Sequence, residues 1–376
     1  MIFNLFKSKS KLGIDVGTAA IKIIELEKEG GRFGLKNYGL FELKGQPVEA
    51  GTGSAGLPGQ GILKLPDQEI IWGIKEIIKK SKMSSTDAVA SLPSFSTFST
   101  IIEMPYLSEE DLAQAIPFEA RKYVPIPLSE VVLDWSIIDI IGQGADAGGT
   151  SSVPAGTQVA GKGAKPTTVK VFLAAVPKDE TARYQRIMKG AGLNLRALEL
   201  ENTALARALL GNDLSTTAVI NIGGRSTSIL VVDKGYEQIS HNYEVGGFEI
   251  AKSIARSLNV SLEKAEELKR KLGLKQTDEN IVNEAMGSLL DMMVFEAKKT
   301  ITNYESSRNQ KISRVLLAGG LVNMPNFVEY FKQKLGRETT VANSFARIVY
   351  PPTLNPIVQE LANTFSVAVG LAMREI

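Results

Sequence analysis

The chain has 376 residues, 44% of them apolar, and its 43 Lys and Arg nearly balance 41 Asp and Glu. That length and apolar content favour two folded domains over a single core or a disordered chain. The absence of Cys excludes a disulfide framework, thiol catalysis and Cys-bound zinc, and the single His excludes a multi-His metal site. A net charge of +2 provides no basic field, so we expect no nucleic-acid partner.

The apolar segments are short for a membrane-spanning helix, which needs about 20 apolar residues. The longest candidates are 131–141 and 365–373, and the first of them contains two aspartates. Apolar residues precede the lysines in the segment 1–11, which is the reverse of a secretory signal. We therefore expect a cytoplasmic protein.

The first informative segment is Leu12–Leu26, where two apolar strands around a short turn predict a β-hairpin. Asp15 lies near the end of the first strand, Gly17 and Thr18 form the turn, and Lys22 lies on the second strand. Glycine lets a phosphate approach the backbone without a Cβ in the way, and a threonine hydroxyl adds a donor. A carboxylate repels phosphate, so Asp15 suits such a site only through a cation, best Mg²⁺ with its waters.

The middle of the first half alternates strands, helices and loops. Two segments rich in glycine, 45–61 and 142–166, are predicted loops, and the second is predicted to be the mobile tip of a long hairpin. A helix begins at Ser108 with a sequence similar to a capping box. Strands are predicted at 88–92, 96–104, 131–138 and 168–176. This interleaving indicates an α/β protein.

A near-repeat of the first hairpin follows 206 positions later, at Ala218–Val232. Asn221 takes the position of Asp15, and a second apolar strand again follows the turn. Small and hydroxyl-bearing residues again form the turn, namely Gly223, Gly224, Ser226 and Thr227. The repeat predicts a second hairpin whose tip exposes backbone N–H groups to a phosphate.

Two further pieces lie downstream. Glu266 and Lys269 are three residues apart on a predicted helix, so both can reach the same ribose. Gly319 and Gly320 follow an apolar strand, and their backbone can lie close to a flat or phosphorylated group. Each piece alone has an ordinary alternative, a tight turn or a solvated ion pair worth about 0.2–0.5 kcal/mol. The order of all four pieces in one chain is what indicates a nucleotide site.

In that order the pieces resemble the signature of the actin-like ATPase superfamily. Within it, the chain is similar over essentially its full length to the PilM family of type IV pilus assembly proteins. The run most typical of that family is Tyr123–Pro127 with the acidic strand 131–134 behind it. The phosphate hairpins are shared by the wider superfamily and are less specific.

The resemblance implies an α/β, two-lobed actin-like (ribonuclease H-like) fold. Lobe one is then expected at 1–211, and it includes an inserted small α/β subdomain at 83–173, of the type shared with FtsA, with a flexible loop at 142–166. Lobe two is expected at 212–364, with a helical subdomain at about 256–311. The helix at 365–376 is expected to return to lobe one.

The resemblance also implies that ATP and Mg²⁺ occupy the cleft between the lobes. Asp15 is expected to hold Mg²⁺ through water, and the nucleotide-binding residues are Asp15, Gly17, Thr18, Lys22, Asn221, Gly223, Gly224, Ser226, Thr227, Glu266, Lys269, Gly319 and Gly320. The second hairpin of the superfamily usually starts with Asp rather than Asn221, so ATP binding is a firmer expectation than hydrolysis. No catalytic residue is assigned.

The expected partner is the N-terminal cytoplasmic tail of a PilN-like inner-membrane protein, gripped in a nucleotide-dependent way during type IV pilus or related type II secretion assembly. This partner would recruit the chain to the inner face of the membrane; other pilus proteins or self-association are further options. Candidate peptide contacts are Ile101, Met104, Tyr106 and Tyr123, with core packing as the alternative role for each. An FtsA-like division filament protein, a kinase of small metabolites and a nucleotide-free scaffold remain as alternatives.

Overall fold

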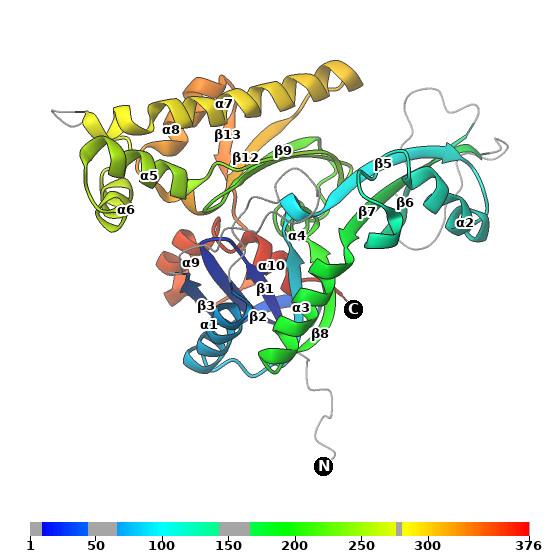
Figure 1. Ribbon diagram of the computed structural model, residues 1–376, viewed down its shortest axis with the longest axis horizontal. Helices are drawn as coiled ribbons and strands as arrows, with labels where there is room; N and C mark the ends of the chain where they lie inside the picture. Colours follow the sequence, from blue (N-terminus) through cyan, green and yellow to red (C-terminus); the bar gives the residue numbers. More distant parts are fainter. Residues whose placement is uncertain (1–9, 44–65, 143–165, 276–279, 376) are drawn as a thin grey trace, which may run out of the picture. The chain divides into compact units, whose positions relative to one another are not determined.

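The computed structural model describes residues 10–43, 66–142, 166–275 and 280–375 (Figure 1). The described chain divides into two compact units: the smaller one runs from Phe95 to Ala182, and the larger one comprises the residues before and after it. The N-terminal segment 1–9 and nearly all of the two predicted glycine-rich loops lie outside the described residues. Within the described ranges, no helix combines the length and apolar character needed to cross a bilayer.

The larger unit contains a six-stranded sheet with the strand order β14-β3-β2-β1-β4-β8. Strands β1, β2 and β3 are consecutive and antiparallel, whereas β4 and β8 run parallel to β1. β1 reads as an almost continuous apolar run because it is buried on both faces, and Leu12 and Ile14 are fully buried. The bounds are β1 Lys11–Val16, β2 Ala20–Glu29, β3 Arg32–Glu42, β4 Asp87–Leu92, β8 Asn194–Leu200 and β14 Ile348–Val349.

A second sheet in the larger unit has the order β11-β10-β9-β12-β13. Three antiparallel strands are again followed by two strands parallel to the first of them. The near-repeat in the sequence is therefore a repeat in topology, and the two halves form the two lobes of an actin-like fold. The bounds are β9 Thr217–Ile222, β10 Thr227–Asp233, β11 Tyr236–Tyr243, β12 Arg314–Ala318 and β13 Thr339–Val341.

Helices cover both faces of the second sheet. Side chains of α5, α7 and α8 pack with Ile220 and Ile229 on one face, and α7 runs along that sheet (Figure 1). On the other face, α4 and α10 form a core with Leu230 that also includes Val89 of the first sheet. This shared core joins the two sheets. The bounds are α1 Asp67–Lys80, α4 Glu201–Leu210, α5 Gly247–Leu258, α6 Leu262–Lys271, α7 Ile281–Arg308, α8 Phe327–Leu335, α9 Asn355–Leu361 and α10 Ser366–Ala372.

The smaller unit contains a three-stranded antiparallel sheet with the order β5-β7-β6. Helix α2 buries Leu112, Ile116 and Ala120 against this sheet, and the Ser108 hydroxyl caps its N-terminus by accepting from the Asp111 N–H. Helix α3 begins in this unit and ends in the larger one. The bounds are β5 Phe98–Pro105, α2 Glu109–Ala120, β6 Val131–Gly142, β7 Pro166–Pro177 and α3 Lys178–Gly190.

The boundaries of this unit differ from the insertion expected at 83–173. The strand predicted at 88–92 is β4, which pairs with β1 and β8 in the six-stranded sheet and so belongs to the larger unit. A short strand has the same sequence pattern in either sheet, and only its pairing partners decide its membership. The smaller unit therefore begins at Phe95.

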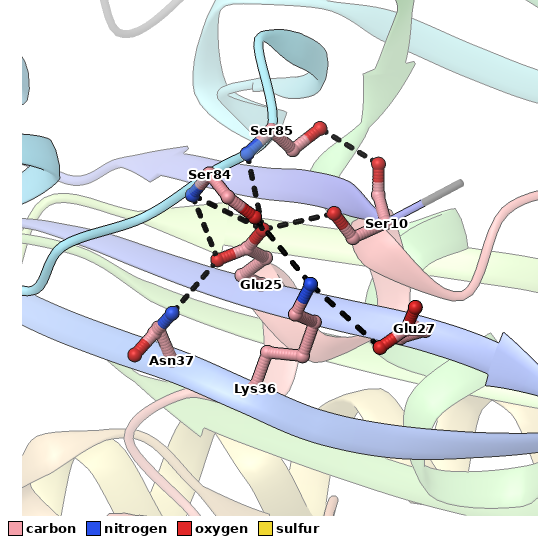
Figure 2. A network of polar contacts seen from close by, with 7 residues as sticks. All are labelled: Ser10, Glu25, Glu27, Lys36, Asn37, Ser84 and Ser85. Carbon is pink, nitrogen blue, oxygen red and sulfur yellow. Dashed lines mark hydrogen bonds and ion pairs between the residues drawn. The ribbon is translucent and has the colours of Figure 1, made fainter. Parts of the chain in front are cut away.

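A buried carboxylate ties several segments of the first sheet together (Figure 2). Glu25 on β2 is fully buried and accepts hydrogen bonds from the side chains of Ser10, Asn37 and Ser84 at 2.7–2.9 Å. The backbone N–H groups of Ser84 and Ser85 also donate to it, at 3.0–3.3 Å. Burial by itself would raise the pKa of Glu25, but these hydrogen bonds outweigh it and lower the pKa below its ordinary value. The ionised side chain thus holds β3 and the segment before β4 against β2.

Candidate functional site

The first hairpin places its aspartate and lysine side by side. Asp15 and Lys22 are directly opposite across β1 and β2, and their side chains form an ion pair at 2.7 Å. Asp15 is 5% exposed, and it also accepts a hydrogen bond of 3.3 Å from the Ser91 hydroxyl on β4. Gly17 closes the turn by donating its N–H to the Ala20 carbonyl at 3.1 Å. The hairpin tip therefore carries a buried carboxylate that is held by Lys22 and Ser91.

The second hairpin is built in the same way but without charge. Asn221 and Ser228 occupy the positions that Asp15 and Lys22 take in the first hairpin, because the register pairs them directly opposite each other. The Ser228 hydroxyl is buried and has no hydrogen-bond partner among the described residues. A neutral amide and hydroxyl thus replace an ion pair.

The first residues of α5 form hydrogen bonds with the tip of the second hairpin. The N–H groups of Gly247 and Phe248 donate to the carbonyls of Gly223 and Gly224 at 3.0 and 2.7 Å. Thr227 is fully buried, and its hydroxyl donates to the Val245 carbonyl at 2.7 Å rather than to a ligand position. The turn itself closes through the Gly223 N–H, which donates to the Ser226 carbonyl at 2.9 Å.

The tips of the two hairpins meet. A Cβ atom added at Gly224 would lie 2.4 Å from the Ala19 Cβ of the first tip, so only glycine permits this approach. Gly224 lies in the turn between β9 and β10, and Ala19 lies in the turn between β1 and β2. Two segments 206 positions apart in the sequence are therefore in contact at their tips.

A glutamate that the sequence analysis did not select lies between the hairpins. Glu201 is the first residue of α4 and accepts from the Asn221 side-chain amide at 3.3 Å. Its second carboxylate oxygen accepts from the Ser94 N–H at 3.3 Å and the Ser94 hydroxyl at 3.4 Å. Burial and the nearby Asp15 carboxylate raise the pKa of Glu201 to about 7. This carboxyl is therefore close to half ionised at neutral pH.

The polar contacts continue from Glu201 into the second sheet. Asn202 accepts from the Ser94 hydroxyl at 2.9 Å and donates to the Ser240 hydroxyl at 2.8 Å. Asn242 on β11 is paired opposite Ser228. The residues missed by sequence reasoning share one signal, since they lie at or just after the carboxyl ends of neighbouring parallel strands: Ser91 and Ser94 at β4, and Glu201 and Asn202 at β8. Ligands bind at such carboxyl ends in open α/β sheets.

The predicted ribose pair lies on α6. Lys269 is 7% exposed, and its ammonium donates to the Gly247 carbonyl and to Glu266, both at 2.7 Å. Burial lowers the pKa of Lys269. Arg270 pairs with Glu266 and with Glu42 at the end of β3, both at 3.0 Å. This helix is thus connected to the start of α5 and to the first sheet.

The predicted glycine pair follows β12. Gly319 has a φ of +93°, and a Cβ there would lie 2.1 Å from the Ile222 carbonyl at the end of β9. Gly320 is exposed and nothing lies within 4 Å of its Cβ position. The turn therefore packs against the tip end of β9 and leaves open space at Gly320.

The candidate peptide residues all lie in the smaller unit. Met104 is 6% exposed and Ile101 is half-buried, both on β5, whereas Tyr106 and Tyr123 are 41% and 42% exposed. Met104 contributes to the core of this unit, which was the alternative role considered for it. The exposed tyrosines remain available to a ligand.

In the part of the chain that the structure describes, no three His, Cys, Asp or Glu side chains gather in a group that could hold a metal ion.

Comparison with known proteins gives consistent results. The chain is similar in structure to the protein in a PilM–PilN type IV pilus biogenesis complex, with a TM-score of 0.76, 22% identity and coverage of 98% of both chains. It is 29% identical over 148 residues to the ethanolamine utilization protein EutJ of Escherichia coli (strain K12), and 27% identical over 191 residues to the cell division protein FtsA of Bacillus subtilis (strain 168). Those matches cover 39% and 50% of this chain, and 48% and 41% of the relatives, so the chain spans less than half of their lengths.

The family comparison covers nearly the whole chain. The model of the type IV pilus assembly protein PilM matches residues 13–149 and 157–376, which include both hairpins, the smaller unit and the shared core. The chain belongs to the PilM family of type IV pilus assembly proteins.

Proposed function

We propose that the protein binds Mg²⁺-ATP between its two hairpins and, in the nucleotide-bound state, grips the N-terminal cytoplasmic tail of a PilN-like inner-membrane protein. The observation that carries the proposal is the meeting of the two hairpin tips at Gly224 and Ala19. This contact brings two sets of turn N–H groups to one place, and such backbone concavities bind anions. Partner binding would recruit the chain from the cytoplasm to the inner face of the membrane during pilus assembly.

The residues of the site fit a metal-bound triphosphate. The backbone of both tips, with Thr18 and Ser226, supplies donors for phosphate oxygens, and Lys22 supplies a positive charge. Mg²⁺ keeps several of its waters and needs one or two carboxylates. Asp15, with Glu201 beside it, provides them, and the cation would offset the burial and the repulsion from Asp15 that together raise the pKa of Glu201.

The nucleoside would lie toward α6 and the Gly319–Gly320 turn. The open space at Gly320 permits a flat base to approach the backbone. Glu266 is engaged by the buried Lys269 and by Arg270, so a ribose hydroxyl would have to displace the more exposed of the two partners, Arg270. Such a displacement costs little, because exposed pairs contribute about 0–1 kcal/mol.

Hydrolysis would be slow or absent in this proposal. Asn221 and Ser228 give the second hairpin no charge with which to hold metal-bound water, and charge-assisted bonds are roughly twice as strong as neutral ones. Glu201 is the group that can orient water, with a pKa of about 7 that suits proton transfer at neutral pH. A phosphate-release assay on wild type and Glu201→Gln measures this contribution.

The partner is proposed from the family and from the PilN of the similar complex. Strand β5 lies at an edge of the three-stranded sheet, and an extended peptide can pair with such an edge while side-chain pockets select its sequence. The exposed rings of Tyr106 and Tyr123 are suitable contacts in the same unit. Tyrosine suits a binding surface because it combines a large apolar ring with a hydroxyl.

The test uses a synthetic peptide with the sequence of the PilN-like tail from the same organism. Calorimetry should show Mg²⁺-ATP binding to the wild type, and Asp15→Ala should weaken it at least about tenfold, because a charge-assisted contact contributes about 1.5–3 kcal/mol. Fluorescence anisotropy should show tighter peptide binding with Mg²⁺-ATP than without it, and Asp15→Ala should lose this difference. Asp291→Ala, which removes an exposed carboxylate of lobe two, serves as the matched control.

Peptide affinity that is equal for the wild type with nucleotide, the wild type without nucleotide and Asp15→Ala would refute nucleotide-dependent gripping. Absence of ATP binding would instead support a scaffold that works without nucleotide. Phosphate transfer to a small hydroxylated metabolite would support the kinase alternative.

A further inference from the structure

The short segment Ser91–Ser94 connects the candidate site to the smaller unit. It comprises the last two residues of β4 and the two residues after them, and the chain enters the smaller unit directly after Ser94. Ser91 and Ser94 are both buried, at 2% and 9% exposed. A displacement of Ser94 is therefore transmitted through a single peptide bond to Phe95, the first described residue of the smaller unit.

Groups from both lobes hold this segment. Ser91 donates to Asp15 at 3.3 Å, and the Ser94 N–H donates to one oxygen of Glu201 at 3.3 Å, with the Ser94 hydroxyl 3.4 Å from the same oxygen. The Ser94 hydroxyl also lies 2.9 Å from the Asn202 oxygen, and the Asn242 amide donates to the Ser94 carbonyl at 3.5 Å. Asp15 and Glu201 of the candidate site thus hydrogen-bond to the segment through which the chain enters the smaller unit.

The second crossing between the units is held differently. The chain returns at Ala182 and Arg183, inside helix α3. Arg183 forms an ion pair of 2.7 Å with Asp67 at the start of α1, and Asp67 belongs to neither hairpin. This crossing therefore provides an internal control for the first.

We propose that Ser94 is a positioning residue that transmits the occupancy of the nucleotide site to the smaller unit through its hydrogen bonds to Glu201. The inference rests on the proposed function, because it assumes that a nucleotide binds beside Asp15 and Glu201. The Glu201 oxygens are already used by Asn221 and Ser94. A cation or water bound to this carboxylate competes for the same lone pairs. The hydrogen bonds between Glu201 and Ser94 therefore change when a nucleotide occupies the site.

The test compares hydrogen–deuterium exchange of the full-length protein with and without Mg²⁺-AMPPNP, in peptides that cover residues 95–105. In the wild type we expect exchange there to change at least about fivefold, which is the lower end of typical coupling between sites. Ser94→Ala and the nearly isosteric Ser94→Cys should bind AMPPNP within about threefold of the wild type but show a change below about twofold. Two variants are used so that a folding defect in one, seen by circular dichroism, leaves the other as the test.

Asp67→Asn is the matched control, because it removes the ion pair at the other crossing and should keep the full response. Ser94 variants that respond like the wild type would overturn the inference, as would AMPPNP binding to the wild type with no change at 95–105. Failure of AMPPNP to bind the wild type at all would be recognised by calorimetry, and it would remove the proposed function and this inference together.

Discussion

Two glutamates of the larger unit, Glu25 and Glu201, occupy opposite electrostatic environments. Glu25 receives hydrogen bonds from side chains and backbone N–H groups, and its pKa is lowered despite full burial. Glu201 is buried, receives fewer bonds and faces the Asp15 carboxylate, so its pKa is raised to about 7. The same residue type is thus stabilised in its ionised form in one place and disfavoured in that form in the other.

The difference distinguishes a glutamate with a structural role from a candidate functional glutamate in the same lobe. Every donor around Glu25 comes from the protein itself, so its charge is compensated in the absence of any ligand. Glu201 lies between two hairpins and would be compensated only when a cation arrives. Titratable groups with pKa values shifted toward neutrality cluster at functional sites, which supports the candidate site on physical grounds.

The largest expected effect is at Glu25. Glu25→Gln should lower the free energy of unfolding by about 3 kcal/mol at pH 7, because it turns an acceptor of several donors into a donor. The pKa of Glu25 is lowered in the native state. Its contribution to stability is therefore fully present at pH values above the ordinary pKa of a glutamate, and it is lost as the pH falls through the native pKa. Urea denaturation measures the change.

The control for Glu25 lies on the same strand (Figure 2). Glu27→Gln removes only an ion pair with Lys36 of 3.7 Å, so its effect should stay below about 0.5 kcal/mol. Equal effects of the two substitutions would contradict the structural role assigned to Glu25.

A third carboxylate sharpens the comparison with an intermediate effect. Glu305 is 7% exposed in its side chain and pairs with Arg337, whose hydrogen bond lowers the pKa of Glu305 to about 2. Glu305→Gln should lower the free energy of unfolding by about 2 kcal/mol at pH 7. The contribution is complete above about pH 4.5 and is lost toward pH 2, so denaturation curves of wild type and variant should converge in acid.

Glu201 should respond with the opposite sign. Its raised pKa means that the native state keeps a proton which the unfolded chain releases, so its ionisation costs stability between about pH 4.5 and 7. Glu201→Gln should therefore increase the free energy of unfolding of the ligand-free protein by about 1–2 kcal/mol at pH 8. The gain should shrink at pH 5, and a loss of stability at pH 8 would show that Glu201 is a structural tie like Glu25.

The smallest expected effect tests the neutral second hairpin. Asn221→Asp adds a carboxylate beside Glu201 and removes an amide donor, so it should destabilise the protein by about 1 kcal/mol without Mg²⁺. Mg²⁺ should restore the loss and shift the melting temperature upward more than in wild type. A variant that melts at the same temperature with and without Mg²⁺ would argue against a cation between the hairpins.

The sequence predicted the two hairpins and their relation, but it missed the group between them. Asp15 and Asn221 were recognisable because each lies near the end of an apolar strand and two positions before a glycine. Glu201 was not, because a polar residue at the start of a helix is common and its environment comes from Asp15, Ser94 and Asn221, which are distant in sequence. The insertion boundary was misplaced for a related reason, since the pairing of β4 decides it.

The sequence by itself determined the local structures: the alternation that forms each strand, the glycines that permit tight tips, and the repeat that duplicates one topology. Tertiary structure alone decided which polar groups share a site and which charges they feel. Local propensities act between neighbours in the chain, whereas desolvation and Coulomb interactions depend on distance in space. For that reason Glu25 and Glu201 are the same residue type in the sequence, but their pKa values are shifted in opposite directions.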